Sequence, residues 1–567
     1  MTVLIKNGFV YDPLNEINGE KMDIWVGNGK IVENVKNPEV IYDASGKIVM
    51  AGGFDIHAHV AGGNLTTART LRPEDNRKRV KARGQFTRAE AGAGLPSAFA
   101  TGYRYIRMGY TFVLQPGMAP LCARQTHDEL NDIPILDKTA LVLTDKNWFM
   151  MRAFMEEDWE FAARFMAWLN WATKASGTKI VAPGSTEAWA WGKSCKNIDD
   201  EVPRWNLTPK DIFVGLAKAN ERLNIPHSIH LHLNALGLPG NASVTLDSIR
   251  ALDSVSKSTN VSRDQVAHLT HVQFNAYGGE SWKTFQSGTE EICKAINARE
   301  NITIDVGAVT PGDWTTITAD GPTEYYLSRL NGLKWTNLDC EFETGAGAVP
   351  FVYSLKNKAN AIQWAIGMEL FLLIDDPWKA MLTTDHPNSG PFTDYPLVMS
   401  WLMSKDERDR TMKEKCHKDL GDRSIIASID REYDFYELAI ATRAAGAKCF
   451  GLETKGHLGV GADADIAVYD FNPETQDSSK EPETIRRVFS SAAFVVKGGL
   501  PLVRDGEIIA DAPHGSTYWL DLPQREGIES EIAEFFGKYY SVSFGNYPVR
   551  ESYIRRSARI PHSSISG

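Results

Sequence analysis

The sequence predicts an α/β protein: a (β/α)8 TIM-like barrel with a small composite β-sandwich built from the N- and C-terminal segments. Apolar, β-branched runs alternate with helical stretches between residues 99 and 400, and this alternation predicts a parallel sheet with right-handed crossovers. About eight such units over this length are typical of a (β/α)8 barrel. Short strand patterns with turn signals flank the region on both sides, which predicts a second domain shared by the two ends.

The composition is that of a large globular protein. Of 567 residues, 43% are hydrophobic and 23% charged, which allows a barrel and a smaller companion domain. The net charge of -11, without a long basic block, argues against nucleic acid as the main partner. No apolar stretch reaches about 18 residues and no signal-peptide pattern opens the chain, so we expect no membrane span. Six scattered cysteines without a Cys-x-x-Cys pair favour a cytoplasmic location and indicate no iron–sulfur cluster.

Residues 1–50 are expected to form the first part of the β-sandwich. Pairs such as Asn7-Gly8 are turn signals between short strand patterns. The expected strands are Thr2–Ile5, Asp23–Val26, Lys30–Val35 and Lys47–Met50.

Residues 51–430 are expected to form the barrel, whose active site would lie at the C-terminal ends of its strands. The predicted strands are Tyr110–Leu114, Thr139–Leu143, Lys179–Ala182, Ser228–Leu233, Val266–Phe274, Ile302–Val306 and Ala380–Thr384. The clearest helical patterns between them are Phe161–Lys174, Pro209–Leu223 and Thr289–Glu300.

Residues 431–515 are expected to supply a helix at Tyr433–Ala445 and then the rest of the sandwich, with strands at Ala493–Lys497, Leu502–Arg504 and Glu507–Ile509. Residues 516–567 are rich in aromatic side chains. We interpret them as an arm that packs on the barrel or on a partner.

The polar segment 61–98 is rich in arginine and lysine. We favour a solvated loop and helix for most of these residues. The alternative is a basic lip that attracts a carboxylate-bearing substrate or an acidic partner, with Arg69, Arg72 and Arg77 as the candidate substrate-binding residues.

Potential metal ligands follow the apolar runs. His57 and His59 come at the end of a strand pattern, and alternating side chains of a strand point the same way. Histidines together with a carboxylate suit Zn²⁺ or a similar ion. The full set of polar residues at such strand ends is His57, His59, Lys179, His227, His230, His232, His268, His271 and Asp385. Of these we expect His227, His230 and His268 to be packing or supporting histidines.

Lys179 is unusual in this set, because a protonated amine repels a cation. It fits if CO2 has added to the amine, since the resulting carbamate can bridge two metal ions. Two divalent ions about 3.5–4 Å apart can activate a hydroxide and polarise a carbonyl. Asp385 could hold one of them and act as the general base.

The ordered set resembles that of the amidohydrolase superfamily. The family pattern Pro-Gly-x-Ile/Val-Asp-x-His-x-His is similar to Ala51–His59, in which Ala51 replaces the usual proline. The closing pattern Gly-x-Leu-x-x-Gly-x-x-Ala-Asp is met by Gly456–Asp465. The resemblance implies that the strand-five and strand-six ligands are His232 and His271, beside His57, His59, N6-carboxylated Lys179 and Asp385.

A closer resemblance, over nearly the whole chain, is to the amidohydrolase-type subunits of formylmethanofuran dehydrogenases. The stretches that carry it are Thr186–Gly192, Pro226–His232, Thr270–Phe274, Asn331–Trp335 and Ala365–Asp375. It implies a dinuclear zinc site that condenses formate with the primary amine of methanofuran, which is amide hydrolysis in reverse. It also implies partner subunits that carry tungsten or molybdenum and iron–sulfur centres and supply the formate through a tunnel. Methanofuran carries several carboxylates, which would give the arginine-rich segment a purpose.

Three other readings stay open at this point. The same ligands would serve a stand-alone hydrolase of cyclic or linear amides, similar to dihydropyrimidinase. A homologous formyltransferase/hydrolase complex would use such a chain in the hydrolytic direction. A silent scaffold would need neither Lys179 nor Asp385.

Overall fold

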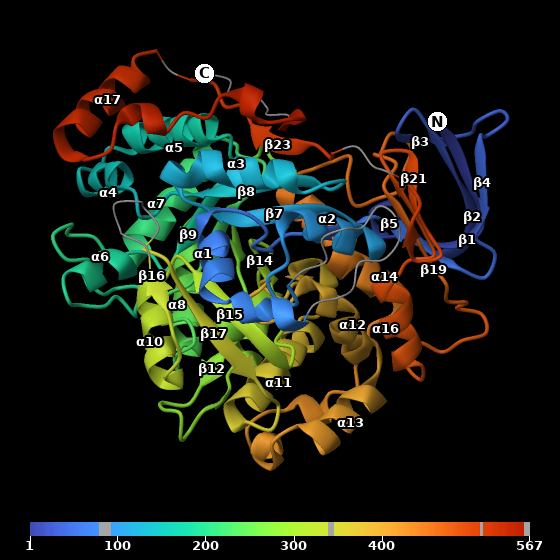
Figure 1. The fold of residues 1–567 in the computed structure, drawn as a ribbon. Coiled ribbons are helices and arrows are strands. Elements are labelled where there is room, and N and C mark those ends of the chain that lie inside the picture. Colours follow the sequence, from blue (N-terminus) through green and yellow to red (C-terminus); the bar gives the residue numbers. More distant parts are fainter. Residues whose placement is uncertain (79–91, 338–344, 511–513, 525, 561–567) are drawn as a thin grey trace.

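A computed structural model describes residues 1–78, 92–337, 345–510, 514–524 and 526–560, without the side chains of 76–78. Two large sheets dominate it (Figure 1). One is the parallel sheet of the barrel, and the other is a nine-stranded sheet at its side.

Eight parallel strands form the barrel, and each pairs with the next in chain order. They are β6 (Gly53–Asp55), β7 (Tyr110–Met118), β8 (Asp137–Leu143), β9 (Thr178–Val181), β10 (Ile229–His232), β11 (Ala267–Leu269), β14 (Ile302–Asp305) and β18 (Ala380–Met381). Just beyond β6 and β18, a parallel bridge joins Ala58 to His386, and the backbone N–H of His59 donates to the His386 carbonyl at 2.7 Å. The predicted barrel is therefore confirmed.

Helices connect these strands and surround them (Figure 1). They include α2 (Ala98–Arg107), α3 (Ala123–Asp132), α4 (Trp148–Met155), α5 (Trp159–Thr173), α6 (Ser185–Ala190), α7 (Pro209–Arg222), α8 (Ala242–Leu252), α9 (Thr289–Asn297), α11 (Lys358–Leu373), α12 (Tyr395–Met403) and α13 (Lys405–Lys415). The start of α7 shows why the sequence predicted it: Thr208 and Asp211 form a reciprocal capping box around Pro209.

The second sheet joins both ends of the chain, as predicted. Its order is β22-β21-β20-β19-β5-β1-β2-β3, with β4 beside β1. The strands are β1 (Thr2–Asp12), β2 (Ile17–Gly27), β3 (Lys30–Val32), β4 (Val40–Asp43), β5 (Ile48–Ala51), β19 (Ile466–Tyr469), β20 (Phe494–Lys497), β21 (Leu500–Arg504) and β22 (Glu507–Ile508). Antiparallel pairing of β5 with β19 connects the two ends. The strands form one continuous sheet around its own core, which includes Val3, Ile5, Val10, Ile466 and Val468.

The predicted turn at Asn7-Gly8 is wrong. Strand β1 continues through this pair, with an irregularity in its pairing with β2 between Ile5 and Gly8. The positive φ of Asn7, 61°, is absorbed by this bulge.

A small insertion between β14 and β18 was not predicted. It consists of β15 (Gly312–Thr318), α10 (Gly321–Asn331), β16 (Thr336–Asn337) and β17 (Gly347–Tyr353), with the three strands in one antiparallel sheet. We call these four elements the lid. Helix α1 (Gly63–Leu71), from the arginine-rich segment, packs on the lid through Leu65 and Ala68.

The predicted helix after the barrel is divided into α14 (Phe435–Ala439), a π-helical turn (Ile440–Ala444) and α15 (Ala445–Phe450). The π-helical turn contacts both β6 and β18. The backbone N–H of Leu382 donates to the Ala441 carbonyl at 2.9 Å, and Arg443 Nε donates to the Ala51 carbonyl at 3.1 Å. This segment therefore supports the barrel beside the start of β6 and the end of β18. Helix α16 (Pro482–Ser490) follows and packs against α12.

The C-terminal arm lies on the barrel (Figure 1). Strand β23 (Thr517–Leu520) adds in parallel to β8, and β24 (Ser557–Ile560) adds to β23. Helix α17 (Ile528–Tyr539) packs its aromatic side chains against α4 and α5, with Phe535 and Phe536 near the ring of Phe149.

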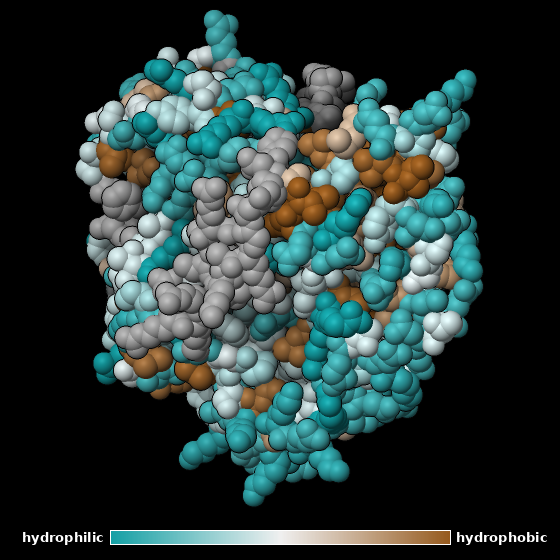
Figure 2. Space-filling model, turned by 45° about the vertical axis from the view of Figure 1, so that its right-hand side comes forward, coloured by the Kyte–Doolittle hydropathy of each residue, from teal (hydrophilic) through white to brown (hydrophobic). Residues whose placement is uncertain are grey.

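Figure 2 shows a face on which hydrophilic side chains dominate and hydrophobic ones gather in separate patches. Exposed apolar side chains also belong to the lid, among them Leu330 and Val352. Within the described parts of the chain, no helix has the length and hydropathy needed to cross a membrane.

Candidate metal centre

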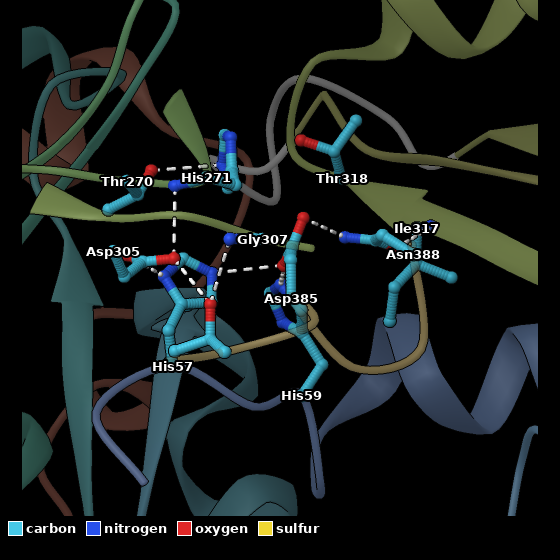
Figure 3. Close-up of polar contacts among 12 residues, drawn as sticks. His57, His59, Thr270, His271, Asp305, Gly307, Ile317, Thr318, Asp385 and Asn388 are labelled. Carbon is cyan, nitrogen blue, oxygen red and sulfur yellow. Dashed lines mark hydrogen bonds and ion pairs between the residues drawn. The ribbon is translucent and has the colours of Figure 1, made fainter. Parts of the chain in front are cut away.

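The six predicted ligand residues converge at the mouth of the barrel. Figure 3 shows His57, His59, His271 and Asp385 there. All six line one cavity with a volume of about 360 Å³. They are His57 and His59 after β6, Lys179 on β9, His232 at the end of β10, His271 after β11, and Asp385 after β18.

Four potential metal-ligand atoms in this group make no hydrogen bond within the described parts of the chain. His57 Nε2, His232 Nε2, His271 Nδ1 and Asp385 Oδ1 are buried and make no hydrogen bond to a described residue. His57, His271 and Asp385 each offer a ligand atom within 4.8 Å of the other two. Buried polar atoms without partners are costly, and imidazole nitrogen with carboxylate oxygen is a suitable donor set for a divalent cation. The residues present therefore fit a metal ion.

Asp385 lies at the centre of the group. Its Oδ1 is 3.1 Å from His57 Nε2 and 3.4 Å from His59 Nε2. Burial alone would raise the pKa of Asp385, but His271 and His57 outweigh it and hold the pKa below its usual range. Asn388 Nδ2 donates to Asp385 Oδ2 at 2.8 Å and fixes the carboxylate plane.

Two other ligand candidates, His232 and His271, are held in the neutral form that can bind a cation. Burial lowers the pKa of His271 to about 3 and that of His232 well below its ordinary value, so both imidazoles are neutral, as a metal ligand must be. Burial also lowers the pKa of Lys179 to about 8, although nearby carboxylates oppose the change. Lys179 Nζ lies 3.4 Å from Thr270 Oγ1.

The local backbone explains how these side chains reach one place. His271 and Asp385 have positive φ values of 35° and 44°, an uncommon conformation that often occurs at functional sites. At the first strand, Gly53 is required because a Cβ there would approach the Tyr110 ring to 2.5 Å. Asp55 then accepts hydrogen bonds from the His57 N–H at 3.0 Å and from the Tyr105 hydroxyl at 2.7 Å.

Asp305 supports the centre from the end of β14. Its Oδ2 is 3.2 Å from both His57 Nδ1 and His268 Nε2. Its Oδ1 accepts from the His271 N–H at 3.0 Å and from the Thr383 hydroxyl at 2.7 Å. Our sequence reasoning missed Asp305, although it lies next to the end of the predicted run Ile302–Val306 and meets the criterion that selected the ligand candidates.

Two further histidines lie below the cavity. His230 Nε2 is 2.9 Å from His57 Nδ1, and His227 Nε2 is 3.1 Å from His230 Nδ1. Neither these two nor His268 lines the cavity. Their positions agree with the supporting role expected for them.

The arginine candidates are placed differently. Arg69 donates hydrogen bonds to the Glu129 carboxylate and to the Pro96 carbonyl, each at 3.2 Å. Arg72 is buried and donates to the Asp313 carbonyl at 3.0 Å. Neither lines the cavity, and the side chain of Arg77 lies outside the described residues.

The lid and the barrel loops build the rest of the cavity wall. Several aromatic side chains contribute to it: Phe274, Tyr277, Trp282, Tyr326, Phe351 and Tyr353. The cavity therefore joins a polar end, which holds the candidate ligands, to a largely apolar region below the lid.

Comparison with known proteins gives consistent matches. A model of the amidohydrolase family matches residues 40–503. Protein FwdA of Methanocaldococcus jannaschii is 48% identical over 98% of this chain and 97% of its own length. The A component of the formyltransferase/hydrolase complex Fhc of Methylorubrum extorquens is 33% identical over 97% of each chain.

Among solved structures, the formyltransferase/hydrolase complex FhcABCD of Methylorubrum extorquens in complex with methylofuran superimposes with a TM-score of 0.89. The match is 31% identical and covers 99% of this chain and 100% of that one. The zinc-containing N-acyl-D-glutamate deacylase of Bordetella bronchiseptica shares the fold, with a TM-score of 0.51 and 14% identity over 90% of this chain and 98% of that one.

Proposed function

Since the chain belongs to the amidohydrolase family, we propose that it is the subunit of a formylmethanofuran dehydrogenase complex that condenses formate with the primary amine of methanofuran. The observation that carries this proposal is the set of four buried potential ligand atoms that make no hydrogen bond to a described residue, in a cavity at the barrel mouth. The full-length similarity to FwdA and to the Fhc component supports it. So does the similarity to a complex that was solved with methylofuran.

His57, His59, N6-carboxylated Lys179, His232, His271 and Asp385 would hold two divalent ions, which we propose to be zinc. When bound, these ions would polarise the formyl oxygen and make water a better nucleophile. The lowered pKa of Lys179 supports its role, because CO2 adds only to the uncharged amine.

Asp385 is proposed to move the proton. Its low pKa keeps it ionised, and Asn388 leaves Oδ1 facing the histidines. In hydrolysis it takes a proton from water and passes it to the leaving nitrogen, and in condensation the order is reversed. The balance is R–NH–CHO + H2O ⇌ R–NH3⁺ + HCOO⁻.

The lid is proposed to exclude water and to hold the body of methanofuran against the aromatic wall. Partner subunits with tungsten or molybdenum and iron–sulfur centres would supply formate, and the complex would be cytoplasmic. Binding of the methanofuran carboxylates by the arginine-rich segment stays a prediction.

Formate release from N-formylmethanofuran tests the function. The metal-loaded complex and the isolated chain should both release formate, and dihydrouracil should not be hydrolysed. Release by the complex alone would mean that the partners complete the site. Hydrolysis of dihydrouracil without release of formate would support the dihydropyrimidinase-like alternative.

A further inference from the structure

The cavity contains a second buried carboxyl group, Glu324, to which the mechanism above gives no role. Glu324 lies on α10 of the lid, is 1% exposed, and lines the same cavity as the candidate metal ligands. Its Oε2 lies 2.8 Å from Thr316 Oγ1. A carboxyl group in a ligand cavity is a candidate for direct contact with the substrate.

A short path connects Glu324 to Asp385 through the lid. Asn388, which donates to Asp385, accepts through Oδ1 from the backbone N–H of Ile317 at 2.6 Å. Figure 3 shows Asn388 between Asp385 and Ile317. Thr316, which precedes Ile317 on β15, shares a hydrogen bond with Glu324. Glu324 is therefore held in a fixed relation to the proton-transferring group.

The position of Glu324 is also fixed by packing. Helix α10 lies so close to β17 that a Cβ on Gly347 would be 2.5 Å from Glu324 Cβ. Asp320 caps the start of α10 by accepting from the N–H of Thr323. Side chains on such rigid elements can select a ligand by geometry.

Glu324 has no cationic partner among the described residues. The lysine that lines the cavity is Lys179, which is needed as an anionic carbamate. An unpaired buried carboxylate is costly. Burial, together with Asp320 and Asp385, accordingly raises the pKa of Glu324 well above its ordinary value.

The surroundings can accommodate both protonation states. Thr316 Oγ1 is 3.0 Å from the Val349 carbonyl as well as 2.8 Å from Glu324, but a hydroxyl has only one hydrogen to donate. With neutral Glu324, Thr316 donates to Val349 and accepts from the acid. With ionised Glu324, Thr316 can turn its hydrogen to the carboxylate.

We propose that Glu324 binds the amino group of the substrate as an ammonium ion and so selects a primary amine at this site. This inference rests on the proposed function, because it requires an amine substrate. An amine that enters uncharged takes the proton of Glu324. An amine that enters as ammonium displaces that proton to solvent, so both routes give the same ion pair.

The amine must become neutral before it attacks formate. The ammonium first returns one proton to Glu324, and the nitrogen then forms the N–C bond while one C–O bond of formate breaks. Nitrogen loses two protons in total, the first to Glu324 and the second through Asp385 to the departing oxygen, which takes its other proton from solvent and leaves as water. The overall change is R–NH3⁺ + HCOO⁻ → R–NH–CHO + H2O.

The test compares a ligand whose amino group is charged with one whose nitrogen is an uncharged formamide. For Glu324→Gln in the metal-loaded complex, the KM of N-formylmethanofuran and the inhibition constant of methanofuran are measured in the hydrolytic direction. We expect the inhibition constant to rise at least about tenfold, as expected when one partner of a buried charge pair is removed. The KM should change by less than about twofold, because this substrate forms no ion pair. Metal content and melting temperature should be unchanged.

Two further variants complete the test. Glu187→Gln is the matched control, since Glu187 is a buried carboxyl whose pKa is raised to about 7 by burial but which does not line the cavity. It should alter neither constant. Thr316→Val keeps the carboxyl but removes its hydroxyl partner, and should raise the inhibition constant by a smaller factor. This variant decides the question if Glu324→Gln does not fold.

Equal changes in both constants, or an unchanged inhibition constant, would overturn the role of Glu324. Wild type that releases no formate would instead contradict the proposed function. In that case, calorimetric binding of methanofuran to wild type and Glu324→Gln still tests the ion pair, and equal affinities would reject it.

Discussion

His57 Nε2 and Asp385 Oδ1 lie 3.1 Å apart at the mouth of the barrel, and neither atom has a hydrogen-bond partner among the described residues. The two residues follow the first and the last strand of the barrel. The bridge between Ala58 and His386 brings these strands together beside the pair. The closure of the barrel therefore creates the contact on which the proposed metal centre depends.

Asp385→Asn should abolish amide chemistry while the fold is retained. Asparagine tolerates the positive φ of this position, 44°, so the backbone should not be strained. Loss of the general base should lower formate release by about 10²–10⁴-fold. The measurements are formate release, melting temperature and metal content, because metal content separates loss of the base from loss of a ligand. A variant with most of its activity would remove Asp385 from the mechanism.

Metal uptake by the metal-free protein should depend on CO2 and on pH. Burial lowers the pKa of Lys179 to about 8, so its uncharged fraction rises as the pH increases through that value. At constant dissolved CO2, zinc uptake should be at least about tenfold greater at pH 8.5 than at pH 6.5, because the neutral amine is the form that reacts. The measurement is bound zinc by elemental analysis.

Lys179→Ala provides the control for this prediction. The variant should bind little metal and show no dependence on CO2, and a short carboxylate in the buffer should restore binding in part. Full metal occupancy in Lys179→Ala without any added carboxylate would rule out the bridging carbamate.

Asp305→Asn should weaken metal binding without removing a ligand. Asp305 contacts His57 and His268 and accepts from the His271 N–H and the Thr383 hydroxyl. Loss of such a supporting carboxylate typically costs about 10–100-fold in metal affinity or activity. Competition with a chelator measures the affinity. An unchanged affinity would show that His230, which also contacts His57, is sufficient to orient it.

The sequence was most informative where one rule applied to every strand. Polar residues at the ends of apolar runs included His57, Lys179, His232 and Asp385, because parallel strands present their C-terminal ends at one edge. The family resemblance then selected His232 from its neighbours His227 and His230. The same rule should have identified Asp305. It was missed because a lone carboxylate in an apolar run gives no information about its partners.

The lid could not be predicted from such local sequence patterns. Strands β15 and β17 are separated in sequence by α10, and their pairing depends on tertiary contacts that no local pattern reveals. The predicted strand Val266–Phe274 was too long for a related reason. β11 ends at Leu269, and the left-handed His271 turns the chain into a 3-10 helix, Val272–Asn275.

The buried position of Arg72 differs from the solvated loop expected for most of this segment, and it allows a structural role to be separated from attraction of a carboxylate-bearing substrate. Its guanidinium is buried and lies 3.0 Å from the Asp313 carbonyl and 3.2 Å from Thr315 Oγ1, so it anchors β15. Arg72→Gln should therefore raise the KM of N-formylmethanofuran by loosening the lid. A buried contact is little screened by salt, so the ratio of variant to wild-type KM should be the same at low and high ionic strength. A ratio that falls toward one at high salt would instead indicate that Arg72 attracts the carboxylates of the substrate.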